Sequence, residues 1–393
     1  MSTWQVGRIE DIAEFASIAG EGLQFFDESI WLKYVDRIGI ENCRGVWQDG
    51  RYVGGLAFYR MGQWYGGAPV SCAGVSGVAI DPADRGSGAC KALLVDLLNE
   101  LHSERMPLAC LYASTQRLYR SVGFEQSGHS FTYSLPISSL DASKSARGVA
   151  VRRTMEPDSA QLTELNRYRA RLHNGNLERT VGLWERIFSP IGQSTSTYLI
   201  GEDGAYEGYV VLHHGKRENG YPQSLVASDW VATTVGALQR IVTIIRDHRS
   251  MCDAFQWNGG PQDDLLLSAS EQRTSIKSTN RTLSRIVTLP DALEQRGYAK
   301  HVSGALEINV QDAMLNANNG NWVMELDSGK AKVSRGGTGA IRISIENLVP
   351  LYASLMTASQ LQHLKRLETA NAAQLALADA AFAGPAPWTS EMF

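Results

Sequence analysis

The strongest signal for the fold is a run of thirteen residues, Val78-Ala79-Ile80-Asp81-Pro82-Ala83-Asp84-Arg85-Gly86-Ser87-Gly88-Ala89-Cys90. Its pattern predicts a strand that ends at Ile80, then a glycine turn, then a helix that begins near Ala89. Glycines on both sides of Ser87 allow successive backbone N–H groups to point at an anion, and the helix adds the positive end of its dipole. The run therefore predicts a binding site for the pyrophosphate of a cofactor.

Spacing argues against two common phosphate-binding motifs. A dinucleotide fingerprint needs a third glycine three residues after Gly88, where this chain has Lys91. A nucleoside triphosphate loop needs four residues between its glycine and Gly-Lys-Ser/Thr, and this run lacks that spacing. What fits is Arg-x-x-Gly-x-small over residues 85–90, with Cys90 at the small position. This pattern resembles the acyl-CoA signature of GNAT N-acetyltransferases, which usually ends in Gly or Ala; the alternative is an ordinary strand-to-helix turn without a ligand.

Composition limits the class of protein. A chain of 393 residues suggests two or three domains at roughly 150 residues each. Lys and Arg total 37 against 41 for Asp and Glu, which argues against a general nucleic-acid binder. The sequence starts without a signal-peptide pattern and has no apolar run near the ~20 residues that span a bilayer, so we expect a cytoplasmic protein with no membrane partner. Five scattered cysteines and eight histidines without a ligand spacing predict reduced thiols and no metal.

The first segment, residues 1–140, is predicted to be a mixed α/β domain. Aspartate and glycine at the turn 48–50 are typical of a hairpin, and leucines at helical spacing give the helix after the glycine turn one apolar face. Along the chain, the predicted elements are helix 15–31, hairpin strands 44–47 and 52–58, the strand ending at Ile80, helix 89–104, strand 107–112, helix 116–121 and two strands within 124–135.

The second segment, residues 148–285, repeats this order after a polar run at 137–147 that predicts a linker. Its predicted elements are strand 149–151, helix 159–187, hairpin strands 198–200 and 206–213, strand 225–232, helix 238–245 and strand 254–257. No Arg-x-x-Gly-x-small precedes its central helix, so the segment predicts a second copy of the fold without the cofactor.

The third segment, residues 286–393, differs in composition. Regularly spaced strands with Gly and Asn turns are followed by helices, which predicts a separate α+β domain. The expected strands are 305–310, 320–326, 331–333 and 340–345, and the expected helices are 348–356 and 360–381.

The chain resembles the enhanced intracellular survival (Eis) family of acetyltransferases. The residues that carry the resemblance are Met61–Gly67, Val78–Cys90, Leu118–Glu125, Arg285–Glu294 and Phe393. The resemblance implies tandem GNAT-like domains followed by a sterol-carrier-protein-like domain. It also implies acetyl-CoA as cosubstrate, aminoglycoside amines as acceptors at several positions, and a homo-oligomer, specifically a hexamer.

Attack of an amine on a thioester needs a neutral amine, a stabilised oxyanion and a protonated leaving thiolate. The resemblance places Tyr119 as general acid, and a phenol of pKa ~10 can protonate a thiolate of pKa ~8.5. It places the terminal carboxylate of Phe393 as general base, with an ordinary pKa of ~3.3 to 3.7. The alternatives are a core aromatic for Tyr119 and a free hydrophobic tail for Phe393.

Binding residues complete the predicted site. Backbone N–H groups near Val78 and Ile80 are candidates for the oxyanion. A polycationic acceptor needs carboxylates and an aromatic platform, for which Asp27, Glu28, Trp31 and Glu391 are candidates, although each alone is commonly a solvated charge or a core aromatic. The predicted cofactor contacts are Val78, Ala79, Ile80, Arg85, Gly86, Ser87, Gly88, Ala89, Cys90 and Ser114.

Two other functions fit the same sequence. One is an acyl-CoA or lipid-binding protein without turnover, in which the third domain carries a lipid. The other is an acetyltransferase whose acceptor is a protein lysine or a polyamine. The first predicts that acyl-CoA binds without turnover, and a comparison of acceptors by kcat/KM distinguishes the second from transfer to aminoglycosides.

Overall fold

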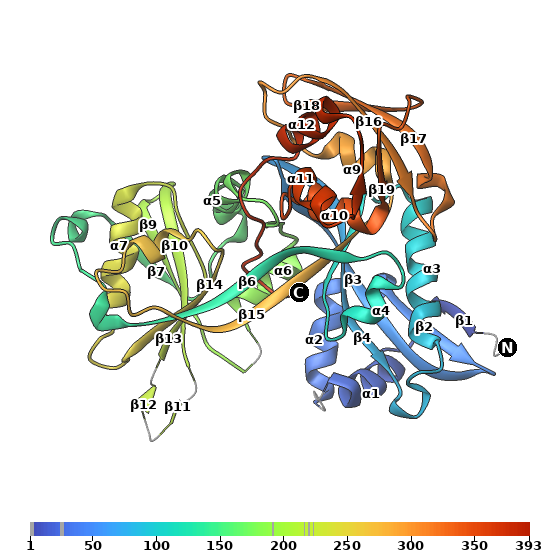
Figure 1. Cartoon of the computed structure of the whole chain (residues 1–393). Coiled ribbons are helices and arrows are strands. Elements are labelled where there is room, and N and C mark those ends of the chain that lie inside the picture. The colour runs from blue at the N-terminus through green and yellow to red at the C-terminus, as the bar shows by residue number, and fades with distance from the viewer. Residues whose placement is uncertain (1–3, 24–26, 191, 216, 219–220, 223) are drawn as a thin grey trace. The chain divides into compact units, whose positions relative to one another are not determined.

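The chain divides into two units. The first comprises the residues up to Gly128 together with Arg281–Pro387 and Phe393, and the second comprises His129–Asn280 and Trp388–Met392. Strands β6 (Glu125–Pro136) and β15 (Ser275–Ile286) each begin in one unit and end in the other. The computed structural model describes residues 4–23, 27–190, 192–215, 217–218, 221–222 and 224–393 (Figure 1).

The first unit contains a sheet in the order β1-β2-β3-β4-β5-β15. All neighbours are antiparallel except β4 and β5, which are parallel. Asp49 and Gly50 both have positive φ, 50° and 79°, so the hairpin predicted at 48–50 is confirmed with the backbone that a tight two-residue turn requires. The bounds are β1 Trp4–Arg8, β2 Cys43–Gln48, β3 Arg51–Tyr65, β4 Ala68–Ile80 and β5 Leu108–Tyr112.

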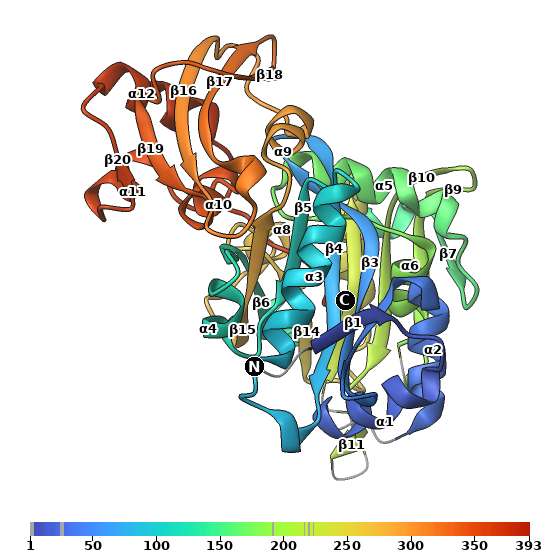
Figure 2. The same cartoon turned by 90° about the vertical axis from the view of Figure 1, so that its right-hand side faces the viewer.

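Helix α3 (Ala89–Ser103) packs on this sheet with the leucine face that its spacing predicts (Figure 2). Its five core leucines, Leu93, Leu94, Leu97, Leu98 and Leu101, are at most 1% exposed. Burial of each such side chain contributes about 1.5–3 kcal/mol, so this face anchors the helix that follows the glycine turn. The other helices here are α1 Ile12–Leu23, α2 Glu28–Ile38 and α4 Gln116–Arg120.

The first unit also holds a second sheet, in the order β18-β17-β16-β19-β20 (Figure 2). Alternate residues of β16 are buried, as in a strand with one face on a core. The strands are β16 Gly304–Gln311, β17 Gly320–Asp327, β18 Lys330–Arg335, β19 Ile341–Ser344 and β20 Leu367–Glu368, and the helices are α9 Leu289–Gln295, α10 Ile345–Tyr352, α11 Ala358–His363 and α12 Ala372–Ala381.

A buried ion pair links β15 to the third segment of the chain. Arg285 Nη2 lies 2.7 Å from both oxygens of Asp312, and the two side chains are 0% and 1% exposed. Arg285 Nε also donates to the carbonyl of Val122 at 3.1 Å. A buried charge needs such a partner, so the pair fixes β15 to both neighbouring segments.

The second unit repeats the strand order of the first. Its sheet has the order β6-β14-β13-β10-β9-β7. Helix α7 connects the parallel strands β13 and β14, just as α3 connects the parallel strands β4 and β5 in the first unit. The bounds are β7 Val151–Thr154, β8 Leu177–Glu178, β9 Ser196–Glu202, β10 Ala205–His214, β11 Arg217–Glu218, β12 Tyr221–Pro222, β13 Ser224–Ala232, β14 Ala254–Gly259, α5 Ser159–Leu172, α6 Val181–Phe188, α7 Val235–Asp247 and α8 Asp264–Leu267.

Three predicted helices were wrong in their extent because capping residues start new helices inside them. Asp27, Thr180 and Asn371 each accept a hydrogen bond from a backbone N–H of the following turn, which begins α2, α6 and α12. Helix 15–31 is therefore α1 and α2, helix 159–187 is α5, β8 and α6, and helix 360–381 is α11, β20 and α12.

Two further predictions were wrong. The two strands expected within 124–135 are the single strand β6. The expected polar linker contains the short 3-10 helices Ile137–Ser139 and Ser145–Gly148 and buries Ile137 and Leu140, whose apolar side chains reach the core of the second unit. Among the described residues, no helix has the combined length and hydrophobicity to cross a bilayer.

Asp263 and His173 give the second unit a testable pH dependence. Burial raises the pKa of Asp263 to about 7 and lowers the pKa of His173 to about 4. Between pH ~4 and 7, Asp263 keeps a proton in the native protein that it loses in the unfolded chain, so its contribution to the free energy of unfolding falls as pH rises. Between pH ~4 and 6.5, His173 binds a proton in the unfolded chain but not in the native protein, so its contribution to the free energy of unfolding rises with pH. Each shift is worth roughly 3–4 kcal/mol, and the two slopes oppose each other.

Asp263→Asn should therefore steepen the gain in the free energy of unfolding between pH 4 and 6.5, relative to the native chain. Asn still accepts the hydrogen bonds from Trp257 Nε1 (3.2 Å) and the Leu265 N–H (3.0 Å), so the helix cap is kept. Denaturant unfolding across this range measures the effect, with Asp253→Asn at an exposed position as control. Parallel curves for the native chain and Asp263→Asn would contradict the prediction.

Candidate active site

The candidate site lies where strands β4 and β5 stop pairing. Their parallel register has three residue pairs, and the last is Gly74 with Cys110. β4 continues to Ile80 beyond this point, whereas β5 ends at Tyr112. Backbone groups that leave a ladder need other partners, so the parted strands offer hydrogen bonds to a ligand.

A β-bulge in β4 lies just beyond this point. Gly55 pairs with Ala79 and Ala57 with Ser76, so Leu56 alone faces the extra residues Gly77 and Val78. Gly77 has φ +62°, and an added Cβ would lie 2.8 Å from the hydroxyl of Tyr34, so both conformation and space favour glycine. A bulge takes backbone N–H groups out of the ladder, which leaves the region of Val78 able to donate to an oxyanion.

The glycine turn has the backbone that an anion site requires. Gly86 and Gly88 have φ of +80° and +100°, and Gly88 is the N-cap of α3. Arg51 Nη2 lies 2.8 Å from both oxygens of Asp84, which braces the preceding 3-10 turn Pro82–Asp84. The first N–H groups of α3 have no acceptor within the helix and carry the positive end of its dipole. Val78, Ala79 and Ile80 lead directly into this turn.

Ser114 and Cys90 complete the predicted cofactor contacts. Ser114 is exposed in the loop between β5 and α4. The Cys90 thiol is in the first turn of α3, and burial raises its pKa to about 11, so it is neutral at physiological pH. Because the Cys90 side chain is small and uncharged, it adds no negative charge beside the backbone N–H groups of the turn.

Tyr119 lies on α4 and is buried, with 5% of its surface exposed. Its ring contacts that of Phe124 edge-on at 6.0 Å between centroids, and it shares a core cluster with Ile80 and Ala89 at the two ends of the turn. Burial, followed by the Cys90 thiol, raises the pKa of Tyr119 above its usual value. The phenol therefore keeps its proton at neutral pH, as a general acid must.

Phe393 is held in the first unit by aromatic contacts. Its ring centroid lies 5.3 Å from that of Tyr112 and 6.5 Å from that of Tyr59, and it is 8% exposed. An added Cβ on Gly74 would lie 3.0 Å from the Phe393 ring. The ring thus occupies the point where β4 and β5 part, and the last residue is not a free tail.

The predicted acceptor residues lie in different surroundings. Asp27 is exposed, caps α2, and accepts from the Ser29 N–H at 2.9 Å. Trp31 is 4% exposed and packs edge-on against Phe15 and Tyr34 at 5.6 and 5.4 Å, so its ring is not an open platform. The side chain of Glu28 lies outside the described residues. Glu391 is in the second unit, ion-paired with Arg179.

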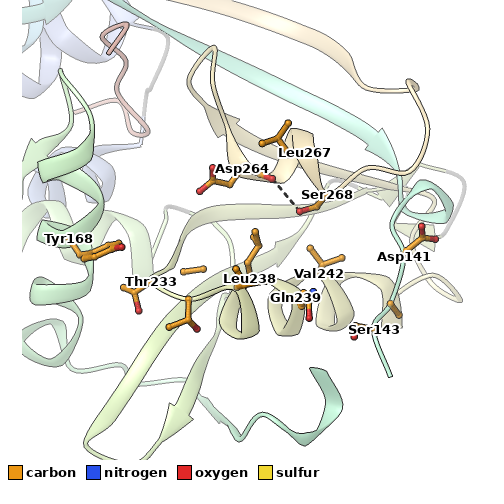
Figure 3. A pocket seen from close by; sticks show the side chains of 14 residues that line it. Asp141, Ser143, Tyr168, Thr233, Leu238, Gln239, Val242, Asp264, Leu267 and Ser268 are labelled. Carbon is orange, nitrogen blue, oxygen red and sulfur yellow. Dashed lines mark hydrogen bonds between the residues drawn. The ribbon is translucent and has the colours of Figure 1, made fainter. Parts of the chain in front are cut away.

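The second unit has a different chemistry at the equivalent place. β13 and β14 part after Ala227 and Trp257, and an added Cβ on Gly260, just after β14, would lie 2.5 Å from the Trp388 ring. A pocket of about 690 Å³ lies at the start of α7, where Leu267 of α8 faces Leu238 (Figure 3).

The lining of this pocket does not suit a pyrophosphate. Its described lining residues include the carboxylates of Asp141 and Asp264 but no Lys or Arg (Figure 3). Like charges would repel a pyrophosphate, and Thr233-Thr234 stand where the first unit has its glycine turn.

Sequence reasoning missed two residues that contact the predicted site residues Phe393 and Glu391. Gly74 sits in an ordinary strand pattern, and nothing local shows that a ring packs on it. Arg179, which binds Glu391, is 212 residues away from it in the chain. The two partners are brought together by the fold and have no signal in local spacing.

Comparisons with known proteins identify the domains of the chain and its relatives. Residues 6–127 and residues 175–286 each match the model of an acetyltransferase (GNAT) domain, and residues 289–390 match a sterol carrier protein domain. A solved GCN5-related N-acetyltransferase from Anabaena variabilis is 33% identical and covers 100% of both chains, with a TM-score of 0.93. N-acetyltransferase Eis of Mycobacterium tuberculosis is 26% identical over 331 residues, 80% of this chain and 79% of its own. Eis1 from Mycobacterium abscessus shares the fold over 100% of both chains, with a TM-score of 0.80 at 18% identity.

The chain therefore belongs to the GCN5-related N-acetyltransferases. Within that family it has the Eis-like architecture, with two GNAT domains and a sterol carrier protein domain, which confirms the resemblance and the fold class predicted from the sequence. Its reaction class is N-acetyl transfer, and acetyltransferases of this fold use acetyl-CoA. The glycine turn before α3 fits the pyrophosphate of that molecule.

Gly88→Ala should weaken acetyl-CoA binding about tenfold. A residue with a Cβ pays roughly 1–2 kcal/mol at φ near +100°, so the turn would shift and misplace its N–H groups. Calorimetric titration with acetyl-CoA measures the change. Gly148→Ala is the control, because no heavy atom lies within 4 Å of the added Cβ. Equal affinity in Gly88→Ala and the native chain would show that the turn does not hold the pyrophosphate.

Proposed function

We propose that the protein transfers the acetyl group of acetyl-CoA to primary amines, with Tyr119 as general acid and the terminal carboxylate of Phe393 as general base. The observation that carries the proposal is the burial of the Phe393 ring against Gly74, where β4 and β5 part. An aromatic ring held there places a carboxylate, ionised at neutral pH, within the same unit as the cofactor turn.

The proposed reaction transfers the acetyl group directly from the thioester to the amine. The amine gives up a proton, through water, to the Phe393 carboxylate and attacks the thioester carbon. The oxyanion accepts hydrogen bonds from backbone N–H groups at the bulge near Val78. When the intermediate collapses, the C–S bond breaks and the Tyr119 phenol protonates the CoA thiolate, giving CoA and the N-acetylamine. Solvent then restores the proton of Tyr119 and takes that of the carboxylate.

The proposed acceptor is a molecule with several amines, such as an aminoglycoside acetylated at more than one position. Asp27 supports this choice, because its exposed carboxylate lies beside α2, which packs at the bulge. Burial of Glu391 in an ion pair with Arg179 makes it a weaker candidate for direct acceptor contact.

A second candidate is a protein that binds acyl-CoA or a lipid without turnover. The sterol carrier protein match over residues 289–390 favours it. This alternative predicts that acetyl-CoA binds but that no amine releases CoA.

Tyr119→Phe should lower kcat about 10²-fold and leave acetyl-CoA affinity unchanged, because it removes a proton donor and keeps the buried ring. The measurement is CoA release with an aminoglycoside, spermidine or a lysine peptide at equal concentrations. The highest kcat/KM identifies the acceptor class.

Tyr206→Phe is the matched control for Tyr119→Phe, because Tyr206 is half-buried in the second unit and its hydroxyl bonds to Asp203 at the surface. An unchanged kcat in Tyr119→Phe would remove Tyr119 as the acid. If the native chain binds acetyl-CoA but releases no CoA with any of the three amines, the binding-protein alternative replaces the transferase proposal.

A further inference from the structure

The segment Trp388–Met392 is bound into the second unit by its backbone. The Trp388 N–H donates to the carbonyl of Asn174 at 2.9 Å, and the Thr389 N–H donates to that of His129 at 3.2 Å. Thr389 Oγ1 donates to the carbonyl of Gly175 at 2.9 Å, and Thr389 is 1% exposed. Arg186 Nη2 donates to the carbonyl of Met392 at 3.2 Å, so these contacts reach the last peptide bond of the chain.

A buried ion pair adds a charged contact to the same segment. Arg179 Nε lies 2.7 Å from Glu391 Oε1, and Arg179 Nη2 lies 2.9 Å from Glu391 Oε2. The Arg179 side chain is 1% exposed and that of Glu391 is 10% exposed. This two-point geometry is the strong form of an arginine–carboxylate interaction.

Glu391 balances the charge of a buried cluster of ionised side chains. Arg179 Nη1 lies 2.5 Å from Asp229, which also pairs with Arg169 at 2.7 Å, so the cluster has two positive and two negative side chains. Burial acts to raise the pKa of Asp229, but the two arginines outweigh it and the pKa is lowered. Without Glu391, two buried cations would share one carboxylate, which is costly.

We propose that Arg179 and Glu391 are positioning residues that keep the terminal carboxylate of Phe393 in place for proton transfer. Ring contacts hold the side chain of Phe393 but not its main chain, which the anchor reaches through the adjacent Met392. A shift of the carboxylate by a residue spacing, ~3.8 Å, is more than proton transfer tolerates. This inference rests on the proposed function, and it gives Glu391 the role of chain anchor in place of acceptor contact.

Glu391→Gln tests the proposal, because it keeps the shape of the side chain and removes its charge. The first readout is the rate at which carboxypeptidase releases phenylalanine from the folded protein, which reports how often the terminal segment detaches. The second is the separation of kcat and KM in CoA release. Arg147→Gln is the matched control, since it breaks an exposed bidentate pair with Asp247 in the same unit.

The proposal predicts at least tenfold faster release of phenylalanine and at least tenfold lower kcat in Glu391→Gln, with acetyl-CoA affinity unchanged and Arg147→Gln like the native chain. Unchanged phenylalanine release, or a rise in acceptor KM alone, would overturn it. If Glu391→Gln does not fold, Arg186→Gln weakens the anchor from its edge and should raise phenylalanine release on its own. If the native chain shows no turnover, phenylalanine release still decides whether the pair anchors the terminus, and the proposed function fails separately.

Discussion

The parting of β4 and β5 after Gly74 is the constraint on which the candidate site depends. Backbone groups beyond this point have lost their ladder partner, and buried backbone groups must find another. The bulge at Gly77 and Val78 lies on the freed end of β4, and the glycine turn at 86–88 follows that strand, so the proposed oxyanion and pyrophosphate donors lie along a single stretch of chain. The leucine face of α3 then fixes this stretch to the core.

The two units share the same strand order but differ in the residues at the turn that follows the parallel pair. In the first unit the strand that leaves the parallel pair leads into a glycine turn at the N-terminus of α3, and a phenylalanine ring packs on Gly74. In the second unit the equivalent strand leads into Thr233-Thr234, a tryptophan ring packs on Gly260, and carboxylates line the pocket beside α7. The two units therefore differ in the local chemistry at this turn and not in strand order, and function depends on such local chemistry more than on the fold.

The sequence was most informative where the signal is local. Gly86 and Gly88 predicted a turn because their left-handed backbone excludes most other residues, and the leucines of α3 predicted its buried face through their spacing. Asp27, Thr180 and Asn371 are local signals too, but each lies inside a longer stretch whose apolar spacing predicts one continuous helix. Gly74 beneath Phe393, and Arg179 with Glu391, could not be predicted, because each pair joins residues far apart in the chain and has no periodicity.

The most direct test of a catalytic terminal carboxylate is the rate of CoA release by the native chain and by a chain with one glycine appended after Phe393. The added residue keeps every side chain and moves the charge by about 3.5 Å, beyond the reach of proton transfer. If the carboxylate is the base, turnover collapses while acetyl-CoA still binds and the thermal unfolding midpoint stays the same. Equal turnover in the two chains would show that another group accepts the proton.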